Sequence, residues 1–407
     1  MEIYFPLILD GATGTQLQKR GYGGGMCAEE WLLSHPEAIK EVQRLYVENG
    51  SDIVYASTFG GNRVKLEENK LFNKVDSINK ELVGFSKEAV AGSAFVAGDL
   101  APTGQFLAPL GDMPFDEMVE VYEEQAKALE EAGVDLFVIE TMMTVPEARA
   151  AVLAVKNVSK KPVFVSFTCD NNGKTLTGTD VTAALLIMQG MGVDAFGLNC
   201  SVGPDDMLVQ LRRLSEYAEV PLIAKPNAGI PELVDGKTIY SCTPEEFSKY
   251  LKDFAQAGVA IFGGCCGTTE DHIKAIYEGT RDIKIKPPAP AHPDMLPLAT
   301  EKMPTLLNAD VVISQGDVLP CDESLADALS EEADKESPVT AIRIKSFDEL
   351  SDFEDNQISI KKPLCLLCED AGILEEALRL YQGRAMYEGS IDESILEGLA
   401  KKYGLVY

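Results

Sequence analysis

Short apolar runs alternate with longer amphipathic stretches along roughly the first 285 residues of the chain. The stretches carry apolar residues at helical spacing, whereas the runs are rich in residues that favour strands. Eight such runs occur, at residues 7–10, 52–58, 94–100, 136–142, 162–168, 195–200, 221–227 and 259–265. Each is apolar enough to be buried on both faces, and eight parallel strands close a barrel, so the pattern predicts a (β/α)8 TIM barrel over residues 1–285. An open doubly wound sheet is the alternative, although no G-x-G-x-x-G motif follows the first run.

Helix signals support this alternation. Residues 116–133 predict one helix that ends at a glycine, and residues 243–258 predict another. Thr243 is the expected N-cap of the second helix, with Pro244 at its first position and Glu246 completing a capping box.

The pattern changes after residue 285. Residues 286–304 are rich in proline and predict an extended linker. Residues 305–407 carry 22 acidic and 9 basic residues, with strands expected at 309–314, 340–346, 363–369, 384–389 and 404–407. Helical patterns lie between these strands, which predicts a small acidic α/β domain. Cys365 and Cys368 fall within one of its apolar strands, so we interpret them as core residues.

Composition narrows the class of protein. With 45% hydrophobic residues the chain is expected to be globular, and no apolar run approaches the roughly 18 residues that span a bilayer. The N-terminal residues show no basic region followed by a cleavage site, so a cytoplasmic location is expected. A net charge of −29 disfavours binding to nucleic acid or to an anionic membrane. Nine cysteines in such a chain are expected to be reduced thiols or metal ligands.

Polar and thiol side chains end the predicted strands. Catalytic groups of such barrels lie at the carboxyl ends of the strands. Those ends carry Asp10, Thr58, Asp99, Glu140, Thr168, Cys200, Asn227 and Cys265. Taken singly, Thr168 or Asp99 is readily explained as a cap or turn residue. The cysteines are different, because a structural cysteine prefers the interior of a protein to its rim.

Three cysteines can meet at this rim. Cys200 ends the sixth run, and Cys265 and Cys266 end the eighth, so their side chains can converge on one point. Three thiolates fill three corners of a tetrahedral zinc site and leave the fourth for water or substrate. Glycines around the pair give the backbone the freedom that adjacent ligands need. Two alternatives stay open: buried thiols in a glycine-rich turn, or a strained vicinal disulfide acting as a redox switch.

Zinc held by three thiolates is electron-rich, so it suits a soft sulfur ligand better than it suits the activation of water. A substrate thiol in the fourth position is deprotonated by the metal at neutral pH, so no separate protein base is needed. None of the three histidines ends a predicted strand. The chemistry points to alkyl transfer onto a small thiol, with Glu140 able to hold a cationic group and the amides after Asp10 an anionic one.

Several segments resemble one known family. They are LILDGATGTQL, ASTFGGNRVKL, GDLAPTG, DLFVIETM, GLNCSVGP, AKPNAGIPEL and GGCCGTT, all between about residues 5 and 285. Together they are similar to the homocysteine-binding barrel of the cobalamin-dependent methionine synthases and related homocysteine S-methyltransferases. The resemblance implies methyl transfer to homocysteine to give methionine, with the zinc-bound substrate thiolate as the nucleophile.

The resemblance also implies roles for individual residues. The implied zinc ligands are Cys200, Cys265 and Cys266, joined by Asn227 until homocysteine displaces it. Glu140 would bind the amino group of the substrate. Asp10, Gly11 and the following amides would face its carboxylate.

The methyl donor stays open. No D-x-H-x-x-G cobalamin signature occurs in the chain, so a corrinoid would arrive on a separate polypeptide. Residues 375–407 resemble part of a pterin-binding barrel, with Glu388 and Gly389 where that family has an Asn-Ser pair. This favours methylcobalamin on a carrier protein, with residues 305–407 as a degenerate fragment that serves as a docking domain. The alternatives are direct use of S-methylmethionine or a betaine-like donor, and a zinc and thiol sensor or docking protein without turnover.

Overall fold

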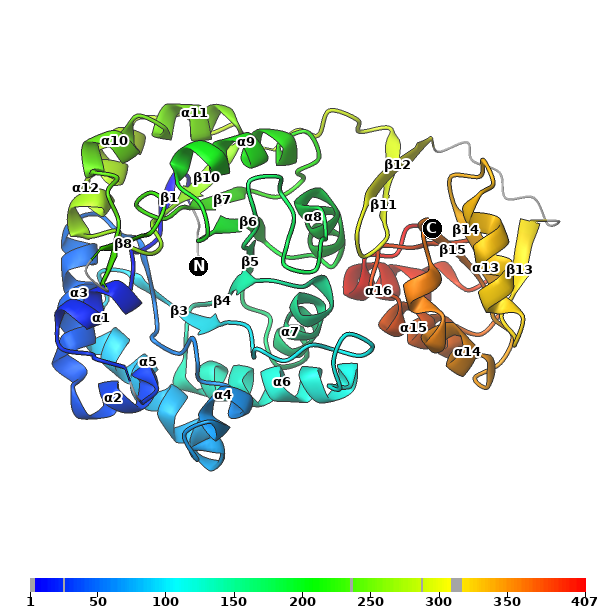
Figure 1. The fold of residues 1–407 in the computed structure, drawn as a ribbon, viewed down its shortest axis with the longest axis horizontal. Coiled ribbons are helices and arrows are strands. Elements are labelled where there is room, and N and C mark those ends of the chain that lie inside the picture. Colours follow the sequence, from blue (N-terminus) through cyan, green and yellow to red (C-terminus); the bar gives the residue numbers. More distant parts are fainter. Residues whose placement is uncertain (1–3, 25, 235–236, 287, 309–316) are drawn as a thin grey trace. The chain divides into compact units, whose positions relative to one another are not determined.

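The computed structural model describes residues 4–24, 26–234, 237–286, 288–308 and 317–407. It divides into two units (Figure 1). The first unit comprises Met1–Thr177, Val193–Ser215 and Glu219–Pro288, and the second comprises Gly178–Gly192, Glu216–Ala218 and Ala289–Tyr407. No helix among the described residues is both long enough and apolar enough to cross a membrane.

The first unit is built on the eight predicted strands. They are β1 (Leu7–Ile8), β2 (Ile53–Tyr55), β3 (Phe95–Leu100), β4 (Leu136–Met142), β5 (Val163–Phe167), β6 (Ala195–Asn199), β7 (Leu222–Lys225) and β10 (Val259–Phe262). They form one parallel sheet in the order β1-β10-β7-β6-β5-β4-β3-β2. The two ends of the sheet, β1 and β2, approach each other, as shown by a hydrogen bond of 2.7 Å from the N–H of Asp52 to the carbonyl of Ile8. The prediction of an eight-stranded barrel is therefore confirmed.

Helices surround these strands (Figure 1). They are α1 (Gly14–Lys19), α2 (Ala28–Ser34), α3 (Pro36–Glu48), α4 (Arg63–Glu67), α5 (Val75–Val90), α6 (Phe115–Ala132), α7 (Val145–Val158), α9 (Pro204–Leu214), α10 (Pro244–Ser248), α11 (Leu251–Gln256) and α12 (Glu270–Thr280). A short antiparallel hairpin, β8 (Glu232–Val234) and β9 (Lys237–Ile239), follows β7.

The predicted helix over 243–258 is two helices, α10 and α11. The N–H groups of Lys249 and Tyr250 bond to carbonyls three residues earlier, so a tighter turn separates the two helices. The expected capping box of Thr243 and Glu246 is present, with Pro244 in the first turn.

The interior of the barrel changes from apolar to polar along the strands. Side chains of a strand alternate between its two faces, and one alternating set packs into a single buried cluster. The cluster contains Leu7, Leu9, Ile53, Tyr55, Ala97, Leu136, Val138, Phe164, Ala195, Ile223, Ala260 and Ile261. Continued toward the carboxyl ends, the same alternation reaches Asp99, Glu140, Ser166, Asn199 and Lys225, each of which is buried. A polar layer therefore lies directly above the apolar core.

The second unit is a small α/β structure, as predicted. Its parallel sheet consists of β13 (Val318–Pro320), β14 (Thr340–Arg343), β15 (Leu364–Leu367) and β16 (Met386–Tyr387). Its helices are α8 (Val181–Gly190), α13 (Leu325–Ala333), α14 (Glu349–Asp355), α15 (Ala371–Leu380) and α16 (Glu393–Tyr403). Cys365 and Cys368 are buried in it, as core residues are. The predicted strand 309–314 lies outside the described residues, and Val406 forms only an isolated bridge with Met386.

Two boundaries differ from the predicted domains. The predicted linker 286–304 contains β11 (Met295–Ala299), which pairs antiparallel with β12 (Pro304–Asn308) and buries Leu298 and Ala299 completely. The segment α8 lies in sequence between β5 and β6 but belongs to the second unit, where the guanidinium of Arg384 donates to the carbonyl of Leu186 at 3.3 Å. The proline content of residues 286–304 does not indicate that β11 and β12 pair with each other. The position of α8 in the sequence does not indicate that this helix belongs to the second unit.

Candidate functional site

Three thiols meet at the carboxyl ends of β6 and β10. The sulfur atoms of Cys200, Cys265 and Cys266 all lie within 4.8 Å of one another, and those of Cys200 and Cys266 are 4.0 Å apart. Zinc–sulfur bonds of about 2.3 Å in a tetrahedral site place two sulfurs about 3.8 Å apart. The cysteines are free thiols in the structure. The cluster therefore has the spacing of a tetrahedral thiolate site.

An unusual backbone conformation brings these thiols together. Cys200 has φ of 61° and Ser201 has φ of 59°, which non-glycine residues seldom adopt. The N–H of Cys200 donates to the carbonyl of Lys225 at 3.1 Å, and that of Cys265 donates to the carbonyl of Pro226 at 2.8 Å. Both ligand segments are thus bonded to the end of β7, which lies between β6 and β10. Backbone strain of this kind is concentrated at functional sites.

Gly267 leaves room for a tyrosine beside the thiols. Its φ is 84°, and a Cβ there would lie 2.3 Å from the ring of Tyr240. Hydrogen bonding with Cys200 raises the pKa of Cys266 to about 11, and a hydrogen bond with the Tyr240 hydroxyl opposes this rise. Gly267 therefore allows Tyr240 to pack closely beside Cys266, in addition to giving the backbone conformational freedom.

The charge state of the thiols follows from their closeness. Hydrogen bonds from Cys265 and Cys266 hold the pKa of Cys200 far below its usual value, and the amide of Asn227 adds to this effect. The same hydrogen bonds to Cys200 raise the pKa of the other two thiols. Two unit charges 4 Å apart repel by about 4 kcal/mol at an effective dielectric constant of about 20. Ionisation of all three thiols therefore requires a cation among them.

Asn227 lies against this cluster. Its side chain is only 2% exposed, and its Oδ1 has no hydrogen-bond partner among the described residues. A hydrogen bond links the Asn227 side chain to Cys200. Because an unsatisfied buried oxygen is costly, this side chain is a candidate for a fourth ligand.

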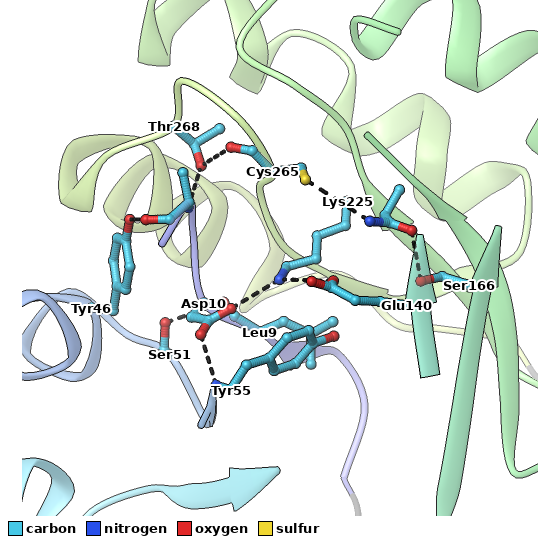
Figure 2. A network of polar contacts seen from close by, with 12 residues as sticks. Leu9, Asp10, Tyr46, Ser51, Tyr55, Glu140, Ser166, Lys225, Cys265 and Thr268 are labelled. Carbon is cyan, nitrogen blue, oxygen red and sulfur yellow. Dashed lines mark hydrogen bonds and ion pairs between the residues drawn. The ribbon is translucent and has the colours of Figure 1, made fainter. Parts of the chain in front are cut away.

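A buried lysine lies between two acids on the same rim (Figure 2). The Nζ of Lys225 is 3.0 Å from Oδ1 of Asp10, 3.7 Å from Oε2 of Glu140 and 3.7 Å from the ring centroid of Tyr55. The other oxygen of Asp10 accepts the N–H of Tyr55 at 2.7 Å. Burial raises the pKa of both carboxyls, against the opposing effect of Lys225. One cation thus faces two acids in a dry environment.

The segment after Asp10 is fixed by side chains. The hydroxyl of Tyr46 donates to the carbonyl of Ala12 at 2.6 Å, and the N–H of Ala12 donates to the hydroxyl of Thr268 at 3.0 Å (Figure 2). Gly11 lies against Tyr46, where a Cβ would come within 2.8 Å of the ring. Among the amides predicted to face a carboxylate, that of Ala12 already has a partner.

Other strand-end residues have structural contacts. The hydroxyl of Thr58 donates to the carbonyl of Asp99 at 2.8 Å, and Thr168 contacts the hydroxyl of Ser201. The Oδ1 of Asp99 is buried without a hydrogen-bond partner among the described residues, and burial raises its pKa well above the usual value.

Sequence reasoning missed three residues of the site: Lys225, Asn199 and Tyr240. Lys225 and Asn199 lie in the apolar runs PLIAKPN and AFGLNC, where a polar residue is costly unless it is paired. Their presence inside buried strands was an available signal. Tyr240 follows the β8–β9 hairpin and carried no signal of its own.

Comparison with known proteins identifies the family. The model of the homocysteine S-methyltransferase family matches residues 7–280. This chain belongs to the homocysteine S-methyltransferase family. It is 32% identical to the methionine synthase of Mycobacterium leprae over 290 residues, which are 66% of this chain and 24% of that protein. The methionine synthase of Mycobacterium tuberculosis is also 32% identical, over 298 residues, or 68% of this chain and 25% of that protein. The match thus spans about a quarter of the length of these relatives.

Solved structures of the same family agree with the fold. The metallated form of the homocysteine methyltransferase MmuM from Escherichia coli has a TM-score of 0.57 at 24% identity, over 67% of this chain and 95% of that one. Its apo form gives a TM-score of 0.54 at 23% identity. At this level of identity the likeness establishes the barrel fold.

Proposed function

We propose that this chain is a zinc-dependent methyltransferase that converts homocysteine to methionine. The observation that carries the proposal is the cluster of three sulfur atoms within 4.8 Å on the rim of the barrel. Membership of the homocysteine S-methyltransferase family supports the choice of substrate.

The donor set suits zinc. Cys200, Cys265 and Cys266 would hold the ion, and the buried Oδ1 of Asn227 would fill the fourth position until a substrate replaces it. Bound zinc would lower the pKa of a thiol that enters this position and keep its sulfur nucleophilic.

Residues of the rim orient the substrate. The Oε2 of Glu140 is buried and has no hydrogen-bond partner among the described residues, so it can accept the α-ammonium group of homocysteine. Asp10 is held by Tyr55 and Lys225. Amides after Asp10 other than that of Ala12, which is bonded to Thr268, would face the substrate carboxylate. Binding at both ends of the amino acid would leave its thiol directed toward the cysteines.

Methyl transfer needs no protein base. The substrate thiol loses its proton to solvent on binding, and an electron pair of sulfur forms the new bond to the methyl carbon. The bond between this carbon and the donor breaks, and its electron pair stays with the donor. His272 takes no part in this scheme, because its ring contacts the hydroxyl of Thr269 and the carbonyl of Cys242.

The donor we propose is methylcobalamin, or another methyl corrinoid, on a separate carrier protein. The methionine synthases that match are about four times as long as the matched segment, so their further parts have no counterpart in the match. The small acidic α/β unit is the proposed docking domain for such a carrier. Direct use of S-methylmethionine or betaine is the competing proposal, and a sensor without turnover is a third.

One experiment separates these functions. Zinc-loaded protein is incubated with homocysteine and, in separate reactions, with methylcobalamin, S-methylmethionine, betaine or methyltetrahydrofolate, and methionine is measured. We expect methionine with methylcobalamin, and none from the Cys266→Ala variant, because loss of one ligand removes the ion. Methionine from S-methylmethionine or betaine alone would establish the direct donor. Homocysteine binding without methionine from any donor would support a sensor instead.

A further inference from the structure

We propose that Asn199 is a positioning residue that couples the thiol cluster to the end of the site that holds the substrate amino group. The proposal rests on the function proposed above and deepens it. Asn199 is the last residue of β6, directly before Cys200, and its side chain is completely buried.

All four hydrogen-bonding positions of the Asn199 amide are used. Its Oδ1 accepts the N–H of Thr141 at 2.8 Å and the hydroxyl of Ser166 at 2.9 Å. Its Nδ2 donates to the hydroxyl of Thr141 at 2.7 Å and to the sulfur of Cys265 at 3.9 Å. Hydrogen bonds run from the sulfur of Cys265 through this amide to Ser166, and Figure 2 labels these two end residues. One side chain thus joins the ends of β4, β5 and β6 to the loop after β10.

The bonds to Thr141 maintain an unfavourable conformation. Thr141 has φ of 60°, which is a genuine outlier for a β-branched residue. It follows Glu140 directly, so a change in its conformation would shift the backbone that carries the Glu140 side chain. Asn199 bonds both the N–H and the hydroxyl of Thr141, which offsets the cost of this conformation.

The bond to Cys265 acts on the other half of the site. Hydrogen bonds to metal ligands orient them, and their loss commonly lowers metal affinity by about 10–100-fold. Asn199 also precedes Cys200, whose own φ is 61°. The same side chain therefore sets the position of one thiol and the conformation next to Glu140, the proposed partner of the substrate amino group.

Asn79 provides a matched control. Its side chain is also completely buried, but its Nδ2 donates to the carbonyls of Gly61 and Val75 and contacts none of the thiols. Asn79→Asp therefore measures the effect of placing an acid at a buried amide position away from the cysteines.

The decisive variant is Asn199→Asp. It keeps the size of the side chain and both bonds to Thr141, because the Thr141 hydroxyl can donate instead of accept. It loses the donor to Cys265 and places an oxygen beside that sulfur. In the full chain, we expect zinc affinity, measured by competition with a chromophoric chelator, to fall by about 10–100-fold. Homocysteine affinity of the zinc-saturated variant, measured by calorimetry without any methyl donor, should change little.

Asn199→Leu removes all four bonds at similar volume, so both affinities should fall together. The coupling is overturned if Asn199→Asp binds zinc as tightly as the unaltered protein does, or if it loses no more affinity than Asn79→Asp. It is also overturned if Asn199→Leu weakens zinc binding while homocysteine binding stays intact. Failure of the unaltered protein to bind zinc would overturn the proposed function itself, which is a distinct result.

Discussion

Glu140 is the residue through which the proposed site would distinguish an amino acid from a simple thiol. Its Oε2 lies 3.7 Å from Lys225 and has no hydrogen-bond partner among the described residues. Asp10, by contrast, is occupied by both Lys225 and the N–H of Tyr55. Of the two carboxylates, Glu140 therefore has the greater capacity to accept an ammonium group.

Glu140→Gln tests this role. We expect homocysteine to bind more weakly, by about tenfold or more, because a charge-assisted hydrogen bond becomes a neutral one. Zinc content should be unchanged, since the proposed zinc ligands are the three clustered cysteines and Glu140 is not one of them. Calorimetry with homocysteine and with 4-mercaptobutyrate, which lacks the amino group, measures the effect. Equal losses for both thiols would show that Glu140 does not contact the amino group.

Lys225 is the residue on which the charge balance depends. Burial lowers the pKa of its ammonium group, but the charges of Asp10 and Glu140 outweigh this effect and raise that pKa well above its usual value. Removal of Lys225 would leave two buried acids without a counter-charge. Breaking a buried ion pair in this way costs about 3–5 kcal/mol.

Lys225→Met should accordingly lower the free energy of unfolding of the barrel by about 3–5 kcal/mol, as measured by urea denaturation. Lys127→Met is the control, because Lys127 and Glu123 form an ion pair of 2.8 Å on α6 of the barrel, with side chains that are 59% and 27% exposed. Its loss should cost far less, because exposed ion pairs contribute little to stability. Similar values for the two variants would contradict the structural role of Lys225.

At the scale of elements, the strands were the most predictable part of the molecule. Eight apolar runs bounded by turn residues correspond to eight strands, because burial on both faces leaves a clear record in sequence. The three cysteines could be placed on one rim for the same reason, since carboxyl ends of parallel strands share an edge. The contacts of Lys225 and Asn199, as distinct from their unusual presence in apolar strands, required the structure, because their partners lie on other strands. The grouping of α8 with the second unit required it too, because its nearly continuous apolar composition does not say what covers it.

The α10 cap tests local sequence signals directly. The N–H of Glu246 donates to the Thr243 hydroxyl at 3.2 Å, and the N–H of Thr243 donates to the Glu246 carboxylate at 2.9 Å. Thr243→Ala should therefore destabilise the barrel by about 1 kcal/mol in urea denaturation, whereas Thr243→Ser should retain most of the stability. No difference between the two variants would mean that this cap contributes nothing measurable.

At the scale of the whole molecule, the barrel combines a conventional apolar core with a polar layer that contains unsatisfied groups. Buried polar atoms are normally hydrogen-bonded, yet oxygens of Asp99, Glu140 and Asn227 have no such partner among the described residues. They lie on the rim that also carries the three thiols. Buried oxygens without hydrogen bonds lower the stability of the ligand-free protein. Ligands bound at this rim would supply the missing hydrogen-bond donors.

The most direct test of this account is X-ray absorption spectroscopy at the zinc edge, with and without homocysteine. The account predicts three sulfur neighbours and one lighter neighbour in the free protein, because the three clustered cysteines leave a fourth position for the proposed ligand Asn227. Added homocysteine should replace the lighter neighbour with a fourth sulfur. A zinc spectrum with fewer than three sulfurs, or one that homocysteine leaves unchanged, would contradict it.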